Sequence, residues 1–141
     1  MAHNCKNLII HCIDFRLGKP LKNYLEKENL LGDCDILSVA GGIKNLLSPK
    51  RVSDKDFLLE QMGVSINLHK IKRVILSNHT DCGAYGGSAK FDSLEEERKF
   101  HIREMDEAKR IISGIYPELK VDLLLGKIMP SGEVGFEEIK I

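Results

Sequence analysis

Two short strings of reactive side chains, CIDFR at residues 12–16 and HTDCG at residues 79–83, stand out in this chain of 141 residues. They contain two thiols, an imidazole, carboxylates and a guanidinium, and each string closes an apolar run typical of a buried strand. Open parallel sheets place their chemistry just beyond the carboxyl ends of the strands. The two strings therefore predict a transition-metal site assembled from two strand ends.

The residue types and their spacing favour zinc at this site. Alternate residues of an extended segment face the same way, so Cys12, Asp14 and Arg16 are expected to share one side of the strand end. His79 and Cys82 are three residues apart, which suits a turn that directs both side chains inward. Two thiolates and one imidazole match tetrahedral Zn²⁺ with a fourth position open to water. Each residue alone is more often an ordinary core residue, but together Cys12, His79 and Cys82 predict a metal site.

The elements that must position these residues alternate along the chain. Apolar runs rich in branched residues predict strands at residues 7–13, 35–39, 72–77 and 121–128, and residues 133–141 predict a short edge strand. Helices are expected from Pro20 to Gly32, from Ser53 to about His69, and from a cap at Asp92 or Ser93 to Gly114.

The last of these helices has the clearest pattern. We expect its apolar stripe to face inward and its charged residues, Glu97 among them, to form a solvated face. The predicted inward stripe is Leu94, Ile102, Met105, Ala108 and Ile112.

Alternating strands and helices predict an α/β fold: a single-domain, open, mainly parallel sheet with helices on both faces and right-handed crossovers. In the common order 2-1-3-4, with residues 133–141 as a possible extra edge strand, the first and third strands are neighbours. Cys12 and His79 then meet at one edge of the sheet. We expect residues 1–141 to form one domain, because this length can bury a core without a structural metal.

Several other residues are expected to have ordinary structural roles. We expect Phe15 to pack in the core, with a role as a pocket wall as the alternative. Asp81 is expected to cap the helix that follows it, or else to support a metal ligand. Cys5 and Cys34 both precede strands and are expected to be reduced neighbours at the far end of the sheet. The histidines without partners in a motif are His3, His69 and His101.

Composition restricts the partners. The chain has 21 basic and 21 acidic side chains, so no basic excess points to nucleic acid or to an anionic membrane surface. No apolar run approaches membrane-spanning length, and the first residues lack a secretory pattern. Four cysteines in such a chain predict reduced thiols. We therefore expect a cytoplasmic protein without a nucleic-acid or membrane partner.

The motifs CxDxR and HxxCG, with an AGG tripeptide at residues 40–42 between them, resemble the pattern of β-class carbonic anhydrases. The specific motifs cover residues 6–85. The sequence departs from that pattern at Phe15, where members commonly have a small residue, and at Gly42, where they commonly have asparagine. The family's N-terminal helical arm and its glutamine are not expected here.

The resemblance implies that Cys12, His79 and Cys82 carry zinc and that Asp14 and Arg16 form a catalytic dyad. It also implies reversible hydration of carbon dioxide to bicarbonate by a zinc-bound hydroxide, in a homodimer or higher homo-oligomer. Asp14, held ionised by Arg16, would accept a hydrogen bond from the hydroxide and assist proton transfer. Backbone amides near two glycines are candidate donors to bicarbonate, namely Gly42 and Gly83.

Several alternatives stay open. Asp14 can swing onto the metal as a fourth ligand and close the site, whereas pairing with Arg16 removes it from zinc. The pair can also be an ordinary salt bridge that fixes a loop. The domain can be a non-catalytic zinc-binding one, or it can hydrolyse another small linear molecule such as carbonyl sulfide or carbon disulfide, because these reactions use the same hydroxide.

Overall fold

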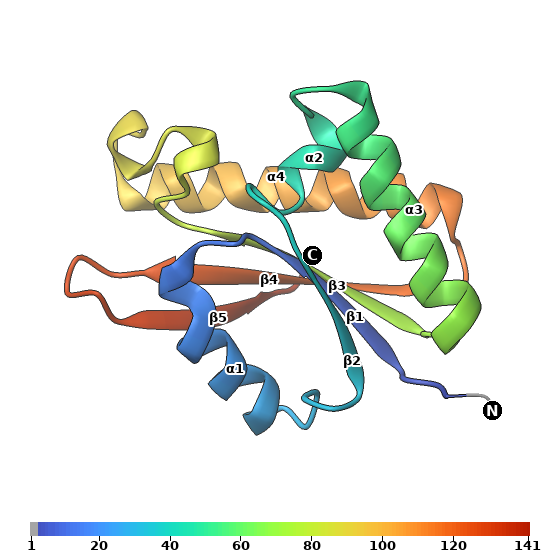
Figure 1. Ribbon diagram of the computed structural model, residues 1–141. Helices are drawn as coiled ribbons and strands as arrows, with labels where there is room; N and C mark the ends of the chain where they lie inside the picture. Colours follow the sequence, from blue (N-terminus) through green and yellow to red (C-terminus); the bar gives the residue numbers. More distant parts are fainter. Residues whose placement is uncertain (1–2) are drawn as a thin grey trace.

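Five strands form one sheet in the order β2-β1-β3-β4-β5 in the computed structural model, which describes residues 3–141 (Figure 1). The first four strands pair in parallel, and β5 pairs antiparallel with β4. The predicted order and the extra edge strand are both confirmed. The strands are β1 (Asn7–His11), β2 (Cys34–Ser38), β3 (Arg73–His79), β4 (Lys120–Ile128) and β5 (Val134–Ile139).

Helices cover both faces of the sheet, as predicted (Figure 1). The helices are α1 (Gly18–Lys27), α2 (Lys44–Leu47), α3 (Val52–His69) and α4 (Leu94–Ile115). Alternate residues of β1 enter different cores, because successive side chains of a strand point to opposite faces. Ile9 packs against Leu21 and Leu25 of α1, whereas Leu8 and Ile10 belong to the core under α2, α3 and α4. This two-sided burial explains why the central strands read as continuous apolar runs.

The element boundaries decide where the motif residues lie. β1 ends at His11, one residue before Cys12, and β3 extends two residues further than predicted, so that His79 is its last residue. β1 and β3 are direct neighbours. The carboxyl ends of these two strands therefore bring the two strings together at one edge of the sheet.

The helix signals are accurate for α4 and less so for α1. The Ser93 side chain accepts a hydrogen bond from the Glu96 amide at 3.1 Å, which confirms the predicted cap. Helix α1 ends at Lys27 rather than at Gly32, since the backbone at Asn29 turns to a φ of +57° and interrupts it. No helix in residues 3–141 is long and apolar enough to cross a membrane.

Three burial predictions are wrong. Phe15 is 89% exposed instead of packing in the core, and Leu94 is 54% exposed instead of facing inward. Glu97, predicted on a solvated face, is 0% exposed. The first turn of α4 therefore buries a carboxylate in place of the leucine.

Candidate metal centre

Three buried side chains converge beyond the ends of β1 and β3. One ligand atom each of Cys12, His79 and Cys82 lies within 4.8 Å of the other two. The sulfur atoms of the two cysteines are 4.0 Å apart. Two zinc–sulfur bonds of about 2.3 Å at a tetrahedral angle place their sulfurs about 3.8 Å apart. The spacing of the thiols therefore fits a tetrahedral cation.

The imidazole of His79 is oriented as a metal ligand. Its Nδ1 donates to the Thr80 carbonyl at 2.7 Å, which leaves the lone pair on Nε2. That Nε2 is buried and has no hydrogen-bond partner among residues 3–141. Burial lowers the pKa of His79, but Cys12 and the Thr80 carbonyl outweigh burial and raise it overall. The pocket thus favours positive charge where Nε2 points, which is the position a cation would occupy.

The two thiols differ in how readily they lose a proton. Their mutual hydrogen bond lowers the pKa of Cys12 and raises the pKa of Cys82, and burial raises both. The amide of Gly41 also donates to the Cys12 sulfur at 3.4 Å. The surroundings therefore stabilise one thiolate, and the second thiolate requires a nearby positive charge, which a bound cation provides.

Arg16 pairs with Asp14 beside the three candidate ligands. Asp14 Oδ1 accepts from the Arg16 amide at 2.9 Å and from its Nε at 3.1 Å, and Oδ2 accepts from Nη2 at 2.8 Å. The Arg16 side chain is the main cause that lowers the pKa of Asp14 to about 2. Asp14 Oδ2 lies 3.8 Å from His79 Nε2. The structure thus shows the arrangement in which Asp14 pairs with Arg16 next to the metal position.

Asp81 ties this dyad to the loop that carries Cys82. Its Oδ2 accepts from Arg16 Nη1 at 3.0 Å, and its backbone carbonyl accepts from Arg16 Nη2 at 3.0 Å. Its Oδ1 accepts from the Ser88 amide at 2.9 Å, at the start of a short 3₁₀ helix (Ser88–Lys90). The hydrogen bonds from Ser88 and then Arg16 lower the pKa of Asp81. Asp81 therefore orients Arg16 and holds the Ser88 turn. Contrary to expectation, it does not cap the 3₁₀ helix that follows it directly (Gly83–Tyr85), because Cys82 occupies the N-cap position there without a side-chain hydrogen bond.

Helix α4 adds buried polar residues to the site that the sequence analysis missed. Glu97 Oε2 accepts from the Asp81 amide and Oε1 accepts from the Ser88 hydroxyl, each at 2.7 Å. His101 is 0% exposed, and its Nδ1 lies 3.0 Å from Asn78 Nδ2. Burial, followed by the charge of His79, lowers the pKa of His101 to about 4. These side chains of α4 therefore contact the loop that carries Cys82 and the end of β3.

The two glycines proposed near the substrate lie in different surroundings. Gly42 is buried with a φ of +52°, and a Cβ atom there would lie 3.0 Å from the Ser77 carbonyl oxygen. Its amide donates to the Val39 carbonyl at 2.9 Å, so the nearby amide that reaches the site is that of Gly41. Gly83 is exposed, and nothing lies within 4 Å of its Cβ position.

A family model and two sequence relatives match most of the chain. A family model described as "Putative carbonic anhydrase" matches residues 2–126. An uncharacterized protein of Rickettsia bellii is 28% identical over 122 residues, which are 84% of this chain and 74% of the relative. An uncharacterized protein of Rickettsia conorii is 27% identical over 122 residues, which are 84% of this chain and 66% of the relative.

Solved structures of low sequence identity share the fold. The carbonic anhydrase from Glaciozyma antarctica matches with a TM-score of 0.60 at 19% identity, covering 96% of this chain and 83% of that chain. The β-carbonic anhydrase isoform I from Trichomonas vaginalis matches with a TM-score of 0.61 at 17% identity and the same two coverages, 96% and 83%. One of two tetrameric β-carbonic anhydrases from Sordaria macrospora matches with a TM-score of 0.54 at 16% identity, covering 99% and 83%.

Proposed function

The chain belongs to the carbonic anhydrase family whose model it matches, and on this premise we propose that it is a zinc-dependent enzyme that reversibly hydrates carbon dioxide to bicarbonate. The observation that carries the proposal is the convergence of two thiols and an unpartnered buried Nε2 beside an ionised carboxylate. Cys12, His79 and Cys82 would hold the Zn²⁺. When bound, the ion supplies a Lewis acid that lowers the pKa of water to about 7.

Asp14 orients the substrate water. Its pKa of about 2 keeps the carboxylate ionised at neutral pH, so it accepts a hydrogen bond and does not retain the proton. Its Oδ2 borders the position toward which His79 Nε2 points, at 3.8 Å from that nitrogen. Asp14 is therefore placed to fix the orientation of a water molecule at the site and to assist transfer of its proton.

Arg16 is the positioning residue of this pair. Arg16 donates three hydrogen bonds to Asp14 and two to Asp81. It therefore fixes the Asp14 carboxylate relative to the loop that carries Cys82. Both carboxylates raise the pKa of Arg16, Asp14 more than Asp81. Asp14 stays ionised, and its pairing with Arg16 keeps it off the proposed metal position and available to the water.

We assign a substrate oxygen to the backbone at Gly83, which is exposed and follows Cys82, because glycine permits close approach of a small anion. Gly42 is not a donor in this proposal, because its amide already donates to the Val39 carbonyl. Gly42 instead lets its turn pass close to Cys12, whose amide nitrogen would lie 3.3 Å from a Cβ atom at this position.

Zinc analysis and stopped-flow hydration of carbon dioxide test the proposal. We expect about one Zn²⁺ at this site and metal-dependent hydration, with the zinc lost in Cys82→Ala. Asp14→Asn should keep its zinc and lose about 100-fold in kcat, the lower range for positioned proton transfer. Asp92→Asn, at an exposed carboxyl outside the site, is the matched control and should match the unaltered chain.

A zinc-loaded chain without hydration from neutral to alkaline pH would refute the enzymatic proposal and would favour the non-catalytic zinc domain. Turnover of carbonyl sulfide or carbon disulfide without turnover of carbon dioxide would instead identify the related hydrolase.

We further propose that residues 1–141 act as one zinc domain in a cytoplasmic homodimer or higher homo-oligomer. Ile13 and Phe15, beside Asp14, are 60% and 89% exposed and offer apolar surface for a second copy. A structural neighbour from Sordaria macrospora is tetrameric. All four cysteines are free, which suits a reducing compartment. Light scattering at micromolar concentration tests the assembly, and a monomer at that concentration would contradict it.

A further inference from the structure

A second cluster of metal-ligating side chains lies at the opposite end of the sheet. One ligand atom each of Cys5, Asp35 and His69 lies within 4.8 Å of the other two. Cys5 precedes β1, Asp35 is on β2, and His69 is the last residue of α3. Because the seven residue-to-residue steps from Cys5 to Cys12 span about 23 Å in extended backbone, this cluster is separate from the first site.

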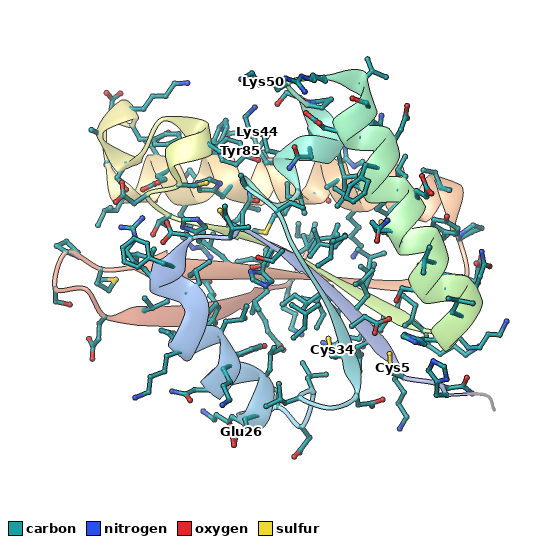
Figure 2. The ribbon with its side chains drawn as sticks, in the orientation of Figure 1. Cys5, Glu26, Cys34, Lys44, Lys50 and Tyr85 are labelled. Carbon is teal, nitrogen blue, oxygen red and sulfur yellow. The ribbon has the colours of Figure 1, made fainter. Side chains whose placement is uncertain are left out.

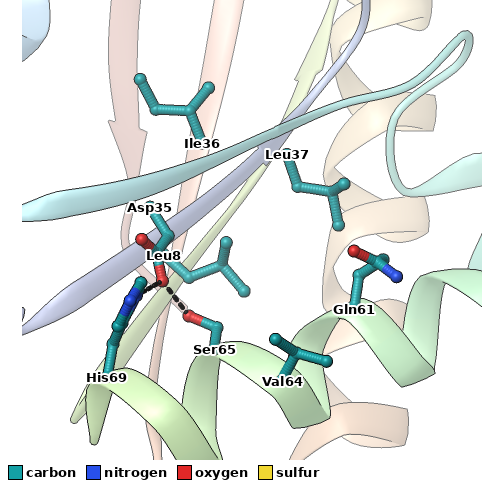
Figure 3. Close-up of a pocket in the computed structure, with 8 residues that line it drawn as sticks. All are labelled: Leu8, Asp35, Ile36, Leu37, Gln61, Val64, Ser65 and His69. Atoms are coloured by element: carbon teal, nitrogen blue, oxygen red, sulfur yellow. Dashed lines mark hydrogen bonds and ion pairs between the residues drawn. The ribbon is translucent and has the colours of Figure 1, made fainter.

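The contacts of Asp35 orient it toward α3. Its Oδ2 accepts from the Ser65 hydroxyl at 2.6 Å and lies 2.7 Å from His69 Nδ1 (Figure 3). The two side chains of the ion pair, Asp35 and His69, are 29% and 30% exposed, so an ion can reach them from solvent. They line a pocket of about 230 Å³ between β2 and α3. The carboxylate and the imidazole are thus held together at an accessible position.

Cys5 is fixed against the same end of α3. Its amide donates to the His69 carbonyl at 3.1 Å, and the Lys6 carbonyl accepts from the Lys72 amide at 2.8 Å. These backbone bonds bring the thiol to the other two ligands. The thiol donates a long bond of 3.4 Å to the Asn7 carbonyl. The ring of His3 lies 5.0 Å from that of His69 between centroids and brings a further imidazole to the rim.

The chemistry of the donors selects the cation. A thiolate, a carboxylate and a neutral imidazole carry two negative charges, which balance a divalent ion. Sulfur and nitrogen donors favour Zn²⁺ and similar transition metals, whereas Ca²⁺ and Mg²⁺ favour oxygen ligands alone. We propose that Cys5, Asp35 and His69 form a second transition-metal site that binds Zn²⁺, with water as the fourth ligand, and joins the N-terminal segment, β2 and α3.

Cys34 provides a matched control for this site. Cys34 is half-buried, as Cys5 is, and lies near Cys5 as expected (Figure 2). Burial and then the charge of Cys5 raise the pKa of Cys34. Its thiol donates to the Asp35 carbonyl at 3.3 Å and does not belong to the cluster. Removing it deletes a neighbouring thiol and leaves the proposed ligands in place.

The test counts zinc per chain. The chain of residues 1–141 is loaded with Zn²⁺, desalted and analysed for bound metal. Cys5→Ser and His69→Gln are each expected to hold one equivalent fewer than the unaltered chain, and Cys34→Ser is expected to hold the same number. If Cys5→Ser loses no equivalent, or if Cys34→Ser loses one as well, the proposal is overturned. Each variant is compared with the unaltered chain, so the difference in bound zinc can be interpreted whatever the occupancy of the Cys12 site.

Substitution with Co²⁺ separates ligand loss from misfolding. A thiolate ligand gives cobalt a charge-transfer absorption, so Cys5→Ser should lose the part that belongs to the second equivalent while its circular dichroism stays unchanged. A folded Cys5→Ser chain with the unaltered cobalt spectrum would overturn the assignment of Cys5 as a ligand.

Discussion

Replacing Glu97 with alanine tests whether a buried carboxylate holds the loop that carries Cys82. Glu97 is 0% exposed, and its two oxygens accept from the Asp81 amide and the Ser88 hydroxyl, each at 2.7 Å. Hydrogen bonds to charged groups contribute about 1.5–3 kcal/mol each, so the loss of both predicts a destabilisation of about 3–6 kcal/mol. The effect should appear in the free energy of unfolding measured with urea.

The same substitution should weaken zinc retention. Asp81 immediately precedes Cys82 and contacts Arg16, so an unsupported Asp81 loosens a ligand and the dyad together. We therefore expect faster transfer of zinc from Glu97→Ala to a chelator. Glu97→Gln keeps the volume and one acceptor oxygen, and its amide can donate to the Ser88 hydroxyl, so it should cost only about 1–2 kcal/mol.

Glu96→Ala is the matched control on the same turn of α4. The Glu96 side chain is 55% exposed and makes an ion pair with Lys99 at 3.8 Å. Its removal should change the free energy of unfolding by less than about 1 kcal/mol. The reasoning is refuted if Glu97→Ala costs no more than Glu96→Ala and releases zinc no faster.

Three further predictions concern Asp14, the two glycines and Phe15, and each is tested by urea unfolding. The pKa of Asp14 is lowered from an ordinary 3.8 to about 2, so its ionised form stabilises the fold above pH 4, and this stabilisation is lost as the pH falls through 2. The difference in free energy of unfolding between the unaltered chain and Asp14→Asn should therefore shrink over that range. A difference that does not change with pH would contradict this. Gly42→Ala should cost about 1–3 kcal/mol because of its positive φ and the nearby Ser77 oxygen, whereas Gly83→Ala should change stability by less than about 0.5 kcal/mol; equal costs would be inconsistent with these surroundings. Phe15→Ser should change the stability of dilute protein by less than about 0.5 kcal/mol, and a loss above about 2 kcal/mol would show that the ring packs after all.

The sheet was predictable because burial on both faces leaves a strong sequence pattern. Leu8, Ile9 and Ile10 alternate between two cores, so the strand reads as an unbroken apolar run with a polar string after it. In β3, Val74, Ile75 and Leu76 likewise alternate between the two cores, and the strand ends at His79. Once these runs are parallel neighbours, the meeting of Cys12 and His79 follows from topology alone, without knowledge of any side-chain contact.

Local backbone geometry was harder to predict, as the region around Phe15 shows. The Asp14 side chain accepts a hydrogen bond from the Arg16 amide and starts a short 3₁₀ helix (Phe15–Leu17). In that turn Asp14 and Arg16 face the site, Leu17 is buried, and Phe15 is left facing solvent. The ion pair between Asp14 and Arg16 fixes this turn, and its effect on the backbone outweighs the general tendency of phenylalanine to be buried.

The register of α4 explains why Glu97 was missed. Glu97 and His101 are spaced by four residues and continue the stripe of three buried residues, Met105, Ala108 and Ile112. The prediction continued that stripe through Leu94 and Ile102 instead, because apolar residues normally mark the buried face of a helix. At this end of α4, however, the packing partner is the Cys82 loop, which presents an amide and a hydroxyl that must be satisfied. A polar residue in phase with a buried apolar stripe, on a helix that follows a motif of candidate metal ligands, therefore indicates support for the loop that carries those residues.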